Sequence, residues 1–134
     1  MSLDITPLVP SGRQVIEAYG GGGFVIAGAR HAGSVLVWPD RSVAWNASTI
    51  ANIGEDSLEP LFAAPSPEIV PEIVPEIVIV GCGPRFQPAP ATLRAAIRAR
   101  GPALEWMDTG AACRTFNVLL AEGRPVVAAL LATF

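Results

Sequence analysis

The stretch Glu76-Ile77-Val78-Ile79-Val80-Gly81 is the part of the chain that most directly indicates its fold. It is a continuous apolar run, rich in β-branched side chains, that ends at a glycine. Such a run is typical of a strand buried on both faces, and strands of this kind belong to parallel sheets covered by helices. We therefore expect residues 76–80 to form a buried parallel strand.

The chain beyond this strand alternates between helical and extended patterns. The expected elements are a helix over Pro88–Arg100, a strand over Leu104–Met107, a helix that begins at Asp108 or Thr109 and runs to Ala121, and a strand over Val126–Leu131. The inward-facing positions of the two helices should be Leu93, Ala96 and Ile97 in the first, and Ala112, Val118 and Leu119 in the second. Because both helices are long enough for crossovers, the first two strands should be parallel, with a right-handed connection.

The first half of the chain predicts a β-meander. Strands are expected at residues 13–19, 24–27 and 34–38, with a glycine turn at Gly20–Gly23, a short extension at residues 42–45 and a short helix at residues 55–62. The only histidine, His31, lies in a Gly/Ala-rich segment that indicates a turn. Together the two halves predict an α/β fold: a three-layer domain with a central mixed sheet, in which an N-terminal β-meander is followed by strand-helix-strand-helix-strand.

Three tandem Pro-Glu-Ile-Val copies occupy residues 67–78. A proline at every fourth position removes donors from a strand ladder and excludes a helix interior. We therefore expect residues 65–74 to be a proline-rich surface insertion, and only the last copy to enter the buried strand. With residues 1–10 as a flexible N-terminus, the 134 residues are predicted to form a single domain.

Charge and residue counts exclude several classes of function. The net charge is −3 and all nine basic residues are dispersed arginines, so no basic face for a nucleic acid is expected. Without lysine there is no Schiff-base or Walker lysine, and with one histidine and two cysteines we expect no metal site and no cofactor. No apolar run is long enough to span a bilayer and no targeting signal begins the chain, so we expect a cytoplasmic protein that does not insert into membranes.

Two segments that follow the predicted parallel strands form the candidate site. In open α/β sheets, ligands collect at the carboxyl ends of parallel strands. Glycines allow close backbone approach, and a helix that starts near Thr109 would present free N–H groups to an anion. The residues expected to meet in one crevice are Gly81, Cys82 and Gly83 from the first segment, and Asp108, Thr109, Cys113, Arg114, Thr115 and Asn117 from the second.

Each of these residues also has a structural interpretation. The two glycines could simply end a strand, and the two cysteines could be ordinary buried side chains. Arg114 could pair with Asp108 or Glu105 as scaffolding, or it could point into the crevice with spare donors, and we expect the binding role. Asn117 could hydrogen-bond a loop carbonyl. No residue is predicted to be catalytic.

The second segment resembles a known family. The motif Ala112-Cys113-Arg114-Thr115-Phe116-Asn117-Val118-Leu119, preceded by Glu105-Trp106-Met107-Asp108-Thr109, is similar to the signature of a small domain family of unknown biochemical function. That family includes mitochondrial respiratory complex I assembly factor 3 and many bacterial homologues. Further matching positions are Gly81-Cys82-Gly83, Glu122-Gly123-Arg124, Gly23-Phe24 and Gly33-Ser34-Val35-Leu36-Val37. The sequence departs from the family at Cys82, where members often carry threonine, and in its Pro-Glu-Ile-Val repeat.

The resemblance implies a three-layer α/β fold and a role in assembling the membrane-bound NADH dehydrogenase. We therefore expect a non-enzymatic protein-binding module whose partner is another protein, such as a respiratory complex subunit or an assembly factor. The alternative is an enzyme or small-anion-binding protein that uses the crevice, with Cys113 or Arg114 central. A thiol switch using Cys82 and Cys113 is a third hypothesis. The sequence does not set the oligomeric state.

Overall fold

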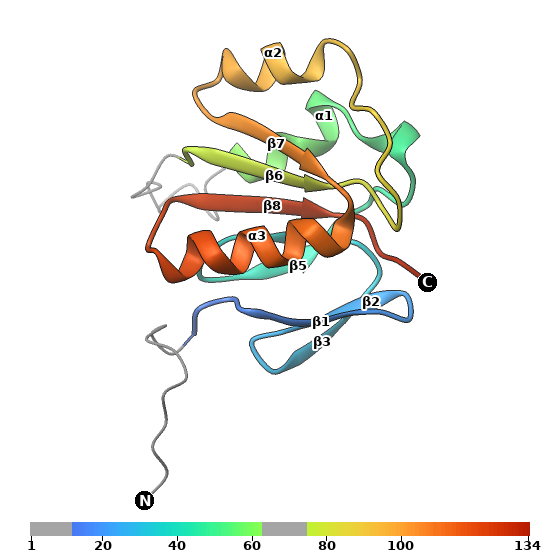
Figure 1. Ribbon diagram of the computed structural model, residues 1–134, viewed down its shortest axis with the longest axis vertical. Helices are drawn as coiled ribbons and strands as arrows, with labels where there is room; N and C mark the ends of the chain where they lie inside the picture. Colours follow the sequence, from blue (N-terminus) through green and yellow to red (C-terminus); the bar gives the residue numbers. More distant parts are fainter. Residues whose placement is uncertain (1–11, 63–74) are drawn as a thin grey trace, which may run out of the picture.

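A five-stranded mixed sheet forms the centre of the computed structural model, which describes residues 12–62 and 75–134 (Figure 1). The strand order is β5-β4-β8-β6-β7. The strands are β4 (Val35–Val37), β5 (Ser42–Ala44), β6 (Ile77–Gly81), β7 (Ala103–Met107) and β8 (Val126–Leu130). β6 runs parallel to both of its neighbours, β7 and β8, whereas β4 runs antiparallel to β8 and β5. The prediction of a buried parallel strand at this place is confirmed.

Helices and a second sheet cover the two faces of the central sheet. One face carries the short helices, which are α1 (Glu55–Leu58), α2 (Leu93–Arg98) and the 3-10 helices η1 (Ile50–Asn52) and η2 (Glu59–Phe62). The other face carries α3 (Thr109–Ala121) and the N-terminal sheet (Figure 1). The chain therefore has the three-layer α/β architecture that its sequence predicts.

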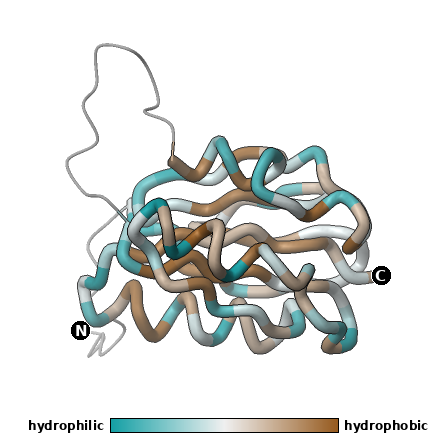
Figure 2. Tube along the Cα trace, turned by 90° about the horizontal axis from the view of Figure 1, so that it is seen from above, coloured by the Kyte–Doolittle hydropathy of each residue, from teal (hydrophilic) through white to brown (hydrophobic). Residues whose placement is uncertain are grey.

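Alternate residues of the same strands supply the two halves of the core. In β6, Val78 and Val80 pack toward α1 and α2, whereas Ile79 packs toward α3. Successive side chains of a strand point to opposite faces, so a strand covered on both sides must be apolar throughout. Figure 2, which colours the Cα trace by hydropathy, shows apolar residues concentrated in the middle strands.

The N-terminal sheet is an antiparallel meander of order β1-β2-β3. Its strands are β1 (Ile16–Gly20), β2 (Gly23–Ile26) and β3 (Ala29–Ala32). The hairpin predicted at Gly20–Gly23 is confirmed. The predicted turn around His31 is wrong, because His31 lies within β3, opposite Phe24. The strand is short, lacks apolar alternation and is bracketed by Gly28 and Gly33 with φ of 81° and 79°, so its sequence has the composition of a turn.

Two details of the predicted helices are also wrong. α2 begins at Leu93 rather than at Pro88. The chain before it contains two prolines, and the Trp106 indole N–H donates to the Gln87 carbonyl at 2.6 Å, which holds this segment outside the helix. Val118 was expected to face inward but is 56% exposed. The inner side of α3 is formed by Thr109, Gly110, Ala112, Cys113, Phe116 and Leu120.

The last Pro-Glu-Ile-Val copy supplies Ile77 and Val78 to β6, as predicted. The first two copies, residues 67–74, lie outside the described residues, as do residues 1–10.

Candidate functional site

Thr109 joins three segments at the carboxyl ends of β6 and β8. Its backbone N–H donates to the Gly83 carbonyl at 2.8 Å. Its hydroxyl accepts from the Gly83 N–H at 3.0 Å and donates to the Leu131 carbonyl at 2.9 Å. A Cβ on Gly81 would lie 3.0 Å from the Thr109 Cα, so only glycine fits there without a shift. The predicted grouping of Gly81, Gly83 and Thr109 therefore forms, and it works as a clasp between the loop after β6, the start of α3 and the end of β8.

The first turn of α3 uses most of its own backbone donors. The Asp108 carboxylate accepts from the Ala111 N–H at 2.9 Å, and the Asp108 carbonyl accepts from the Ala112 N–H at 2.9 Å. The Ala112 bond is the first regular bond of the helix, so the otherwise free donors that are occupied at the helix start are those of Thr109 and Ala111. A helix start usually leaves such groups free for an anion. Here Asp108 acts as the N-cap that the sequence predicts, and little donor capacity is left for a ligand.

Cys82 lies beside a shallow groove on the α1/α2 side of the sheet. This Cys82 groove has a volume of about 340 Å³, and its uncharged lining comes from residues 48–51, the loop after β6 and residues 131 and 132. Cys82 itself is 2% exposed, and its thiol donates to the Arg85 carbonyl at 3.4 Å. A small ligand in this groove would meet neutral polar and apolar groups only.

Cys113 lies on the opposite face of the central sheet from Cys82, and both thiols are free. A switch that joins these two cysteines would have to bridge across the sheet, which argues against the thiol-switch hypothesis. Burial raises the pKa of the Cys113 thiol to about 12, and the neighbouring Arg114 charge only partly opposes this effect. Because the thiolate is the nucleophilic form, Cys113 is unsuited to nucleophilic chemistry near neutral pH.

Asn117 ties α3 to the edge of the N-terminal sheet. Its side-chain amide donates to the Ile16 carbonyl at 2.8 Å, and its oxygen accepts from the Ile16 N–H at 2.9 Å. The side-chain amide thus makes the two hydrogen bonds to Ile16 that a neighbouring strand would make at this edge of β1. They lie next to the irregularity between Ile16 and Ala18. Asn117 therefore bonds a backbone carbonyl, as its structural interpretation proposed, but this carbonyl belongs to strand β1 and not to a loop. Thr115 is likewise engaged, with its hydroxyl 3.4 Å from the Met107 sulfur.

Arg114 lies at a second groove, between α3 and β1. This α3–β1 groove has a volume of about 280 Å³, and it is lined by Ile16, Glu17, Ala18, Tyr19, Cys113, Arg114 and Asn117. Arg114 therefore does not line the Cys82 groove beside Gly83. It also forms none of the ion pairs found among residues 12–62 and 75–134, so it is not paired with Asp108 or Glu105. The predicted single crevice is thus divided between two grooves on opposite faces of the sheet.

Residues 16–131 match the family described as "Protein of unknown function (DUF498/DUF598)". The chain belongs to this family. The resemblance found around the Ala-Cys-Arg-Thr-Phe-Asn motif is confirmed by this match.

Relatives of this DUF498/DUF598 domain include an assembly factor and proteins without an assigned role. It is 40% identical over 116 residues to "NADH dehydrogenase (ubiquinone) 1 alpha subcomplex assembly factor 3" of Homo sapiens. That match covers 87% of this chain and 59% of the human protein, so the chain spans about three fifths of that relative's length. An uncharacterised protein of Rhodobacter capsulatus is 35% identical over 121 residues, which cover 90% of this chain and 86% of that protein.

A solved structure shares the fold of the DUF498/DUF598 domain. The solution structure of a Mth938-like domain protein from Bordetella pertussis aligns with a TM-score of 0.75 at 30% identity, and the alignment covers 98% of this chain and 92% of that one.

The sequence analysis missed the β1 side of the α3–β1 groove in this DUF498/DUF598 domain, and with it Tyr19. Tyr19, the only tyrosine of the chain, is 45% exposed. Its hydroxyl lies 2.4 Å from the position that a Cβ on Gly110 would take, so the absent side chain of Gly110 makes room for it. The signal in the sequence was Gly110, which lies in the first turn of α3. Glycine destabilises a helix, so its presence there indicates that another group packs closely against the helix backbone.

Two kinds of feature are absent from the described residues. Within the described parts of the chain, no group of three or more His, Cys, Asp or Glu side chains is placed to hold a metal ion. In the same parts, every helix falls short of the length and apolar character required to cross a membrane.

Proposed function

We propose that this chain is a non-enzymatic protein-binding module that acts in the assembly of a membrane-bound NADH dehydrogenase, the enzyme of respiratory complex I. The observation that carries the proposal is the 40% identity over 116 residues with the human assembly factor. The partner in this proposal is a subunit of that enzyme or another assembly factor, and the site of action is the cytoplasmic side.

The state of the candidate residues supports binding rather than catalysis. Hydrogen bonds within the chain engage the polar side-chain atoms of Asp108, Thr109 and Asn117. The raised pKa of Cys113 keeps its thiol protonated at neutral pH. An enzyme or small-anion site, the alternative expected from the sequence, needs free donors or an ionisable group tuned to its reaction. The engaged side chains weigh against this alternative.

The test is to remove the protein from cells that make it and to follow the assembly of the NADH dehydrogenase. Native gel electrophoresis of membranes, stained for NADH dehydrogenase activity, should show less of the full-size enzyme and more of smaller subcomplexes. The wild-type gene should restore the full-size band. Full assembly at the normal rate in the deletion strain would refute the proposal.

A tagged copy provides the second arm of the test. It should co-purify with NADH dehydrogenase subunits, identified by antibodies, while growth depends on assembly of that enzyme. A matched variant, Asn117→Asp, weakens the attachment of β1 to α3 and should lower the recovery of those subunits, whereas the exposed-residue variant Asn46→Asp should not.

A further inference from the structure

The α3–β1 groove carries a combination of exposed side chains that is typical of protein interfaces. Arg114 lines it, Tyr19 is 45% exposed at its side, and Val118 is 56% exposed one helical turn beyond Arg114. Residues four apart lie on the same face of a helix, so Arg114 and Val118 present a charge and an apolar group side by side. Tyrosine and arginine are enriched among the residues that contribute most to protein binding.

The charge of Arg114 is not used within the described part of the chain. The three ion pairs there join Arg41 to Asp40, Arg100 to Glu59 and Arg124 to Glu76. Glu17, the acidic residue of the groove, accepts from the Gly28 N–H at the far turn of the meander. The guanidinium of Arg114 therefore keeps its fork of donors for a group from outside.

The Tyr19 hydroxyl and the Arg114 guanidinium both lie close to the backbone of Gly110. A Cβ on Gly110 would lie 2.4 Å from the Tyr19 hydroxyl and 3.4 Å from an Arg114 guanidinium nitrogen. One small planar group could therefore contact both. A carboxylate fits this chemistry, because it accepts two parallel bonds from a guanidinium and a further bond from a hydroxyl.

The walls of the groove are held in place before any partner arrives. The two hydrogen bonds of Asn117 fix β1 against α3, and the floor is formed by the buried Ile16 and Cys113. A surface that does not have to be ordered on binding loses less conformational entropy. The volume of about 280 Å³ is enough for one side chain of a partner rather than for a folded element.

The geometry points to the α3–β1 groove as the docking surface for an acidic residue in an extended protein segment, with an apolar neighbour of that residue packing on Tyr19 and Val118. This inference rests on the proposed protein-binding function and names the chemistry of its partner. A polyanion is a poorer match, because one arginine at this groove, in a chain of net charge −3, gives no extended basic face.

The experiment is an NMR titration of the whole chain with two blocked peptides, Gly-Leu-Glu-Phe-Gly and Gly-Leu-Gln-Phe-Gly. The amide resonances of Tyr19, Arg114 and Val118 should shift with the first peptide. The glutamate peptide should bind about fivefold more tightly than the glutamine peptide, the ratio expected for one exposed charge pair. Arg114→Gln should remove this preference.

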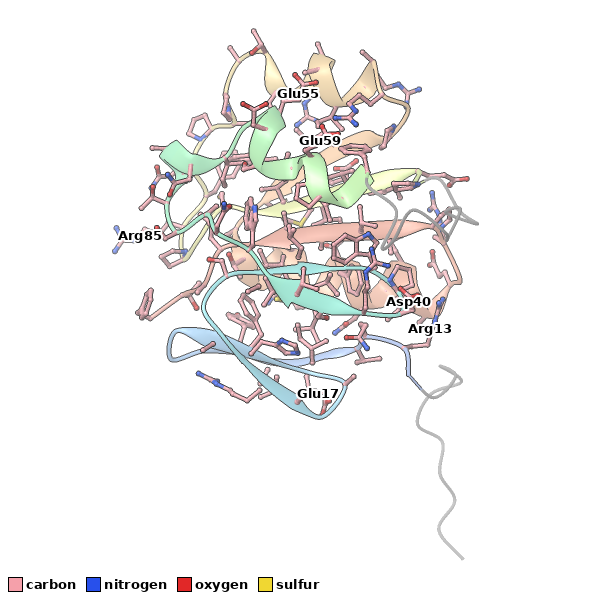
Figure 3. The ribbon with its side chains drawn as sticks, turned by 180° about the vertical axis from the view of Figure 1, so that it is seen from behind. Arg13, Glu17, Asp40, Glu55, Glu59 and Arg85 are labelled. Carbon is pink, nitrogen blue, oxygen red and sulfur yellow. The ribbon has the colours of Figure 1, made fainter. Side chains whose placement is uncertain are left out.

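Arg85→Gln is the matched control. Like Arg114, Arg85 is exposed and forms no ion pair among the described residues. It differs in its place, because it projects from the loop after β6 at the periphery of the molecule (Figure 3). It should leave the preference intact. Equal binding of both peptides, a preference that survives Arg114→Gln, or shifts confined to the Cys82 groove would overturn the inference. Arg114-dependent binding to phosphatidylglycerol vesicles, with no preference for the glutamate peptide, would assign the surface to a membrane and would also overturn it.

A failure of the docking inference can be distinguished from a failure of the proposed assembly role. If the peptides show no preference but NADH dehydrogenase subunits still co-purify with the tagged chain, the docking surface is wrong and the assembly role stands. If assembly is normal without the protein but the glutamate peptide binds at Arg114, the groove binds acidic segments of some other partner.

Discussion

Thr109 shows how one hydroxyl can hold the end of a parallel sheet. It is fully buried, and it satisfies the Gly83 N–H and the Leu131 carbonyl together. At the position before Gly83 the chain carries Cys82, which has no hydroxyl. The hydroxyl of this chain that matters structurally is thus on the helix side of the loop, not on the strand side.

Replacing Thr109 by valine should lower the free energy of unfolding by about 1–3 kcal/mol. Valine has nearly the same shape but leaves the Gly83 N–H and the Leu131 carbonyl without a partner in the core. Urea denaturation followed by tryptophan fluorescence measures the change. Thr115→Val is the control, since Thr115 contacts only a sulfur and should cost clearly less. Equal losses in the two variants would contradict this account of the clasp.

Cys113 should make the protein less stable at alkaline pH. Its pKa is raised from 9.0 to about 12 by burial, so above pH 9 the unfolded chain loses this proton while the folded chain keeps it. Stability is therefore complete below pH 9 and falls as the pH rises toward 12, by at most about 1.4 kcal/mol per pH unit from this group. Urea midpoints from pH 8 to pH 11 should fall less steeply in Cys113→Ala than in wild type. Parallel pH profiles would refute this assignment.

At the scale of elements, the attachment of the meander depends on Asn117. Asn117→Asp retains the acceptor for the Ile16 N–H but replaces the donor by a charged oxygen facing the Ile16 carbonyl. The loss should be about 1–3 kcal/mol, and amide exchange in β1 should accelerate before exchange in β6. Asn46→Asp, a change at an exposed position, should stay within about 0.5 kcal/mol of wild type. Uniform acceleration across both sheets would show that Asn117 has no special role in holding β1.

The elements predicted correctly from the sequence are those whose own residues decide them. β6 and β8 are apolar throughout because both faces are covered, and α3 has Asp108 as its cap and Gly123 after its end. The elements that were missed depend on distant contacts. β3 is a strand because β2 lies beside it, and the start of α2 is set by a bond from Trp106.

The candidate site was predicted in the right segments, but its residues were wrongly expected to meet in one crevice. A helix rises about 1.5 Å per residue, so Cys113 and Asn117 lie roughly 6 and 12 Å along α3 from Thr109. Thr109 reaches the strand ends, whereas Cys113, Arg114 and Asn117 lie farther along the helix, toward β1. The sequence alone does not show which strand a helix will lie against, and so it could not pair Arg114 with Tyr19.

On the scale of the whole molecule, β8 is the strand that makes one sheet out of two pairs. It lies between β4 and β6, so it separates the β5-β4 pair from the β6-β7 pair. The charged residues labelled in Figure 3 lie around the periphery, whereas β8, in the middle of the sheet, is apolar and buried at every position. Both halves of the core contain residues of β8.

A chain that stops after residue 124, without β8, should not unfold cooperatively. The β5-β4 and β6-β7 pairs would then have no hydrogen-bonded neighbour in common, and both halves of the core would be open. Near-ultraviolet circular dichroism and a urea titration should show no fixed tertiary structure and no sharp transition. A chain that lacks only the exposed Phe134 is the control and should unfold like wild type. A cooperative transition in the shorter chain would mean that the two pairs can be joined without β8.

Ribosomes make β8 after all four of the strands that it unites. While residues 82–125 are being synthesised, β4 and β6 already exist, with apolar faces and with edges that have no β8 to pair with. At ordinary rates of translation this period lasts for seconds, long enough for a nascent chain to meet chaperones or other nascent chains. The central sheet therefore has to close after translation of β8, and cells that make this protein quickly will depend on chaperones to keep its early strands apart until then.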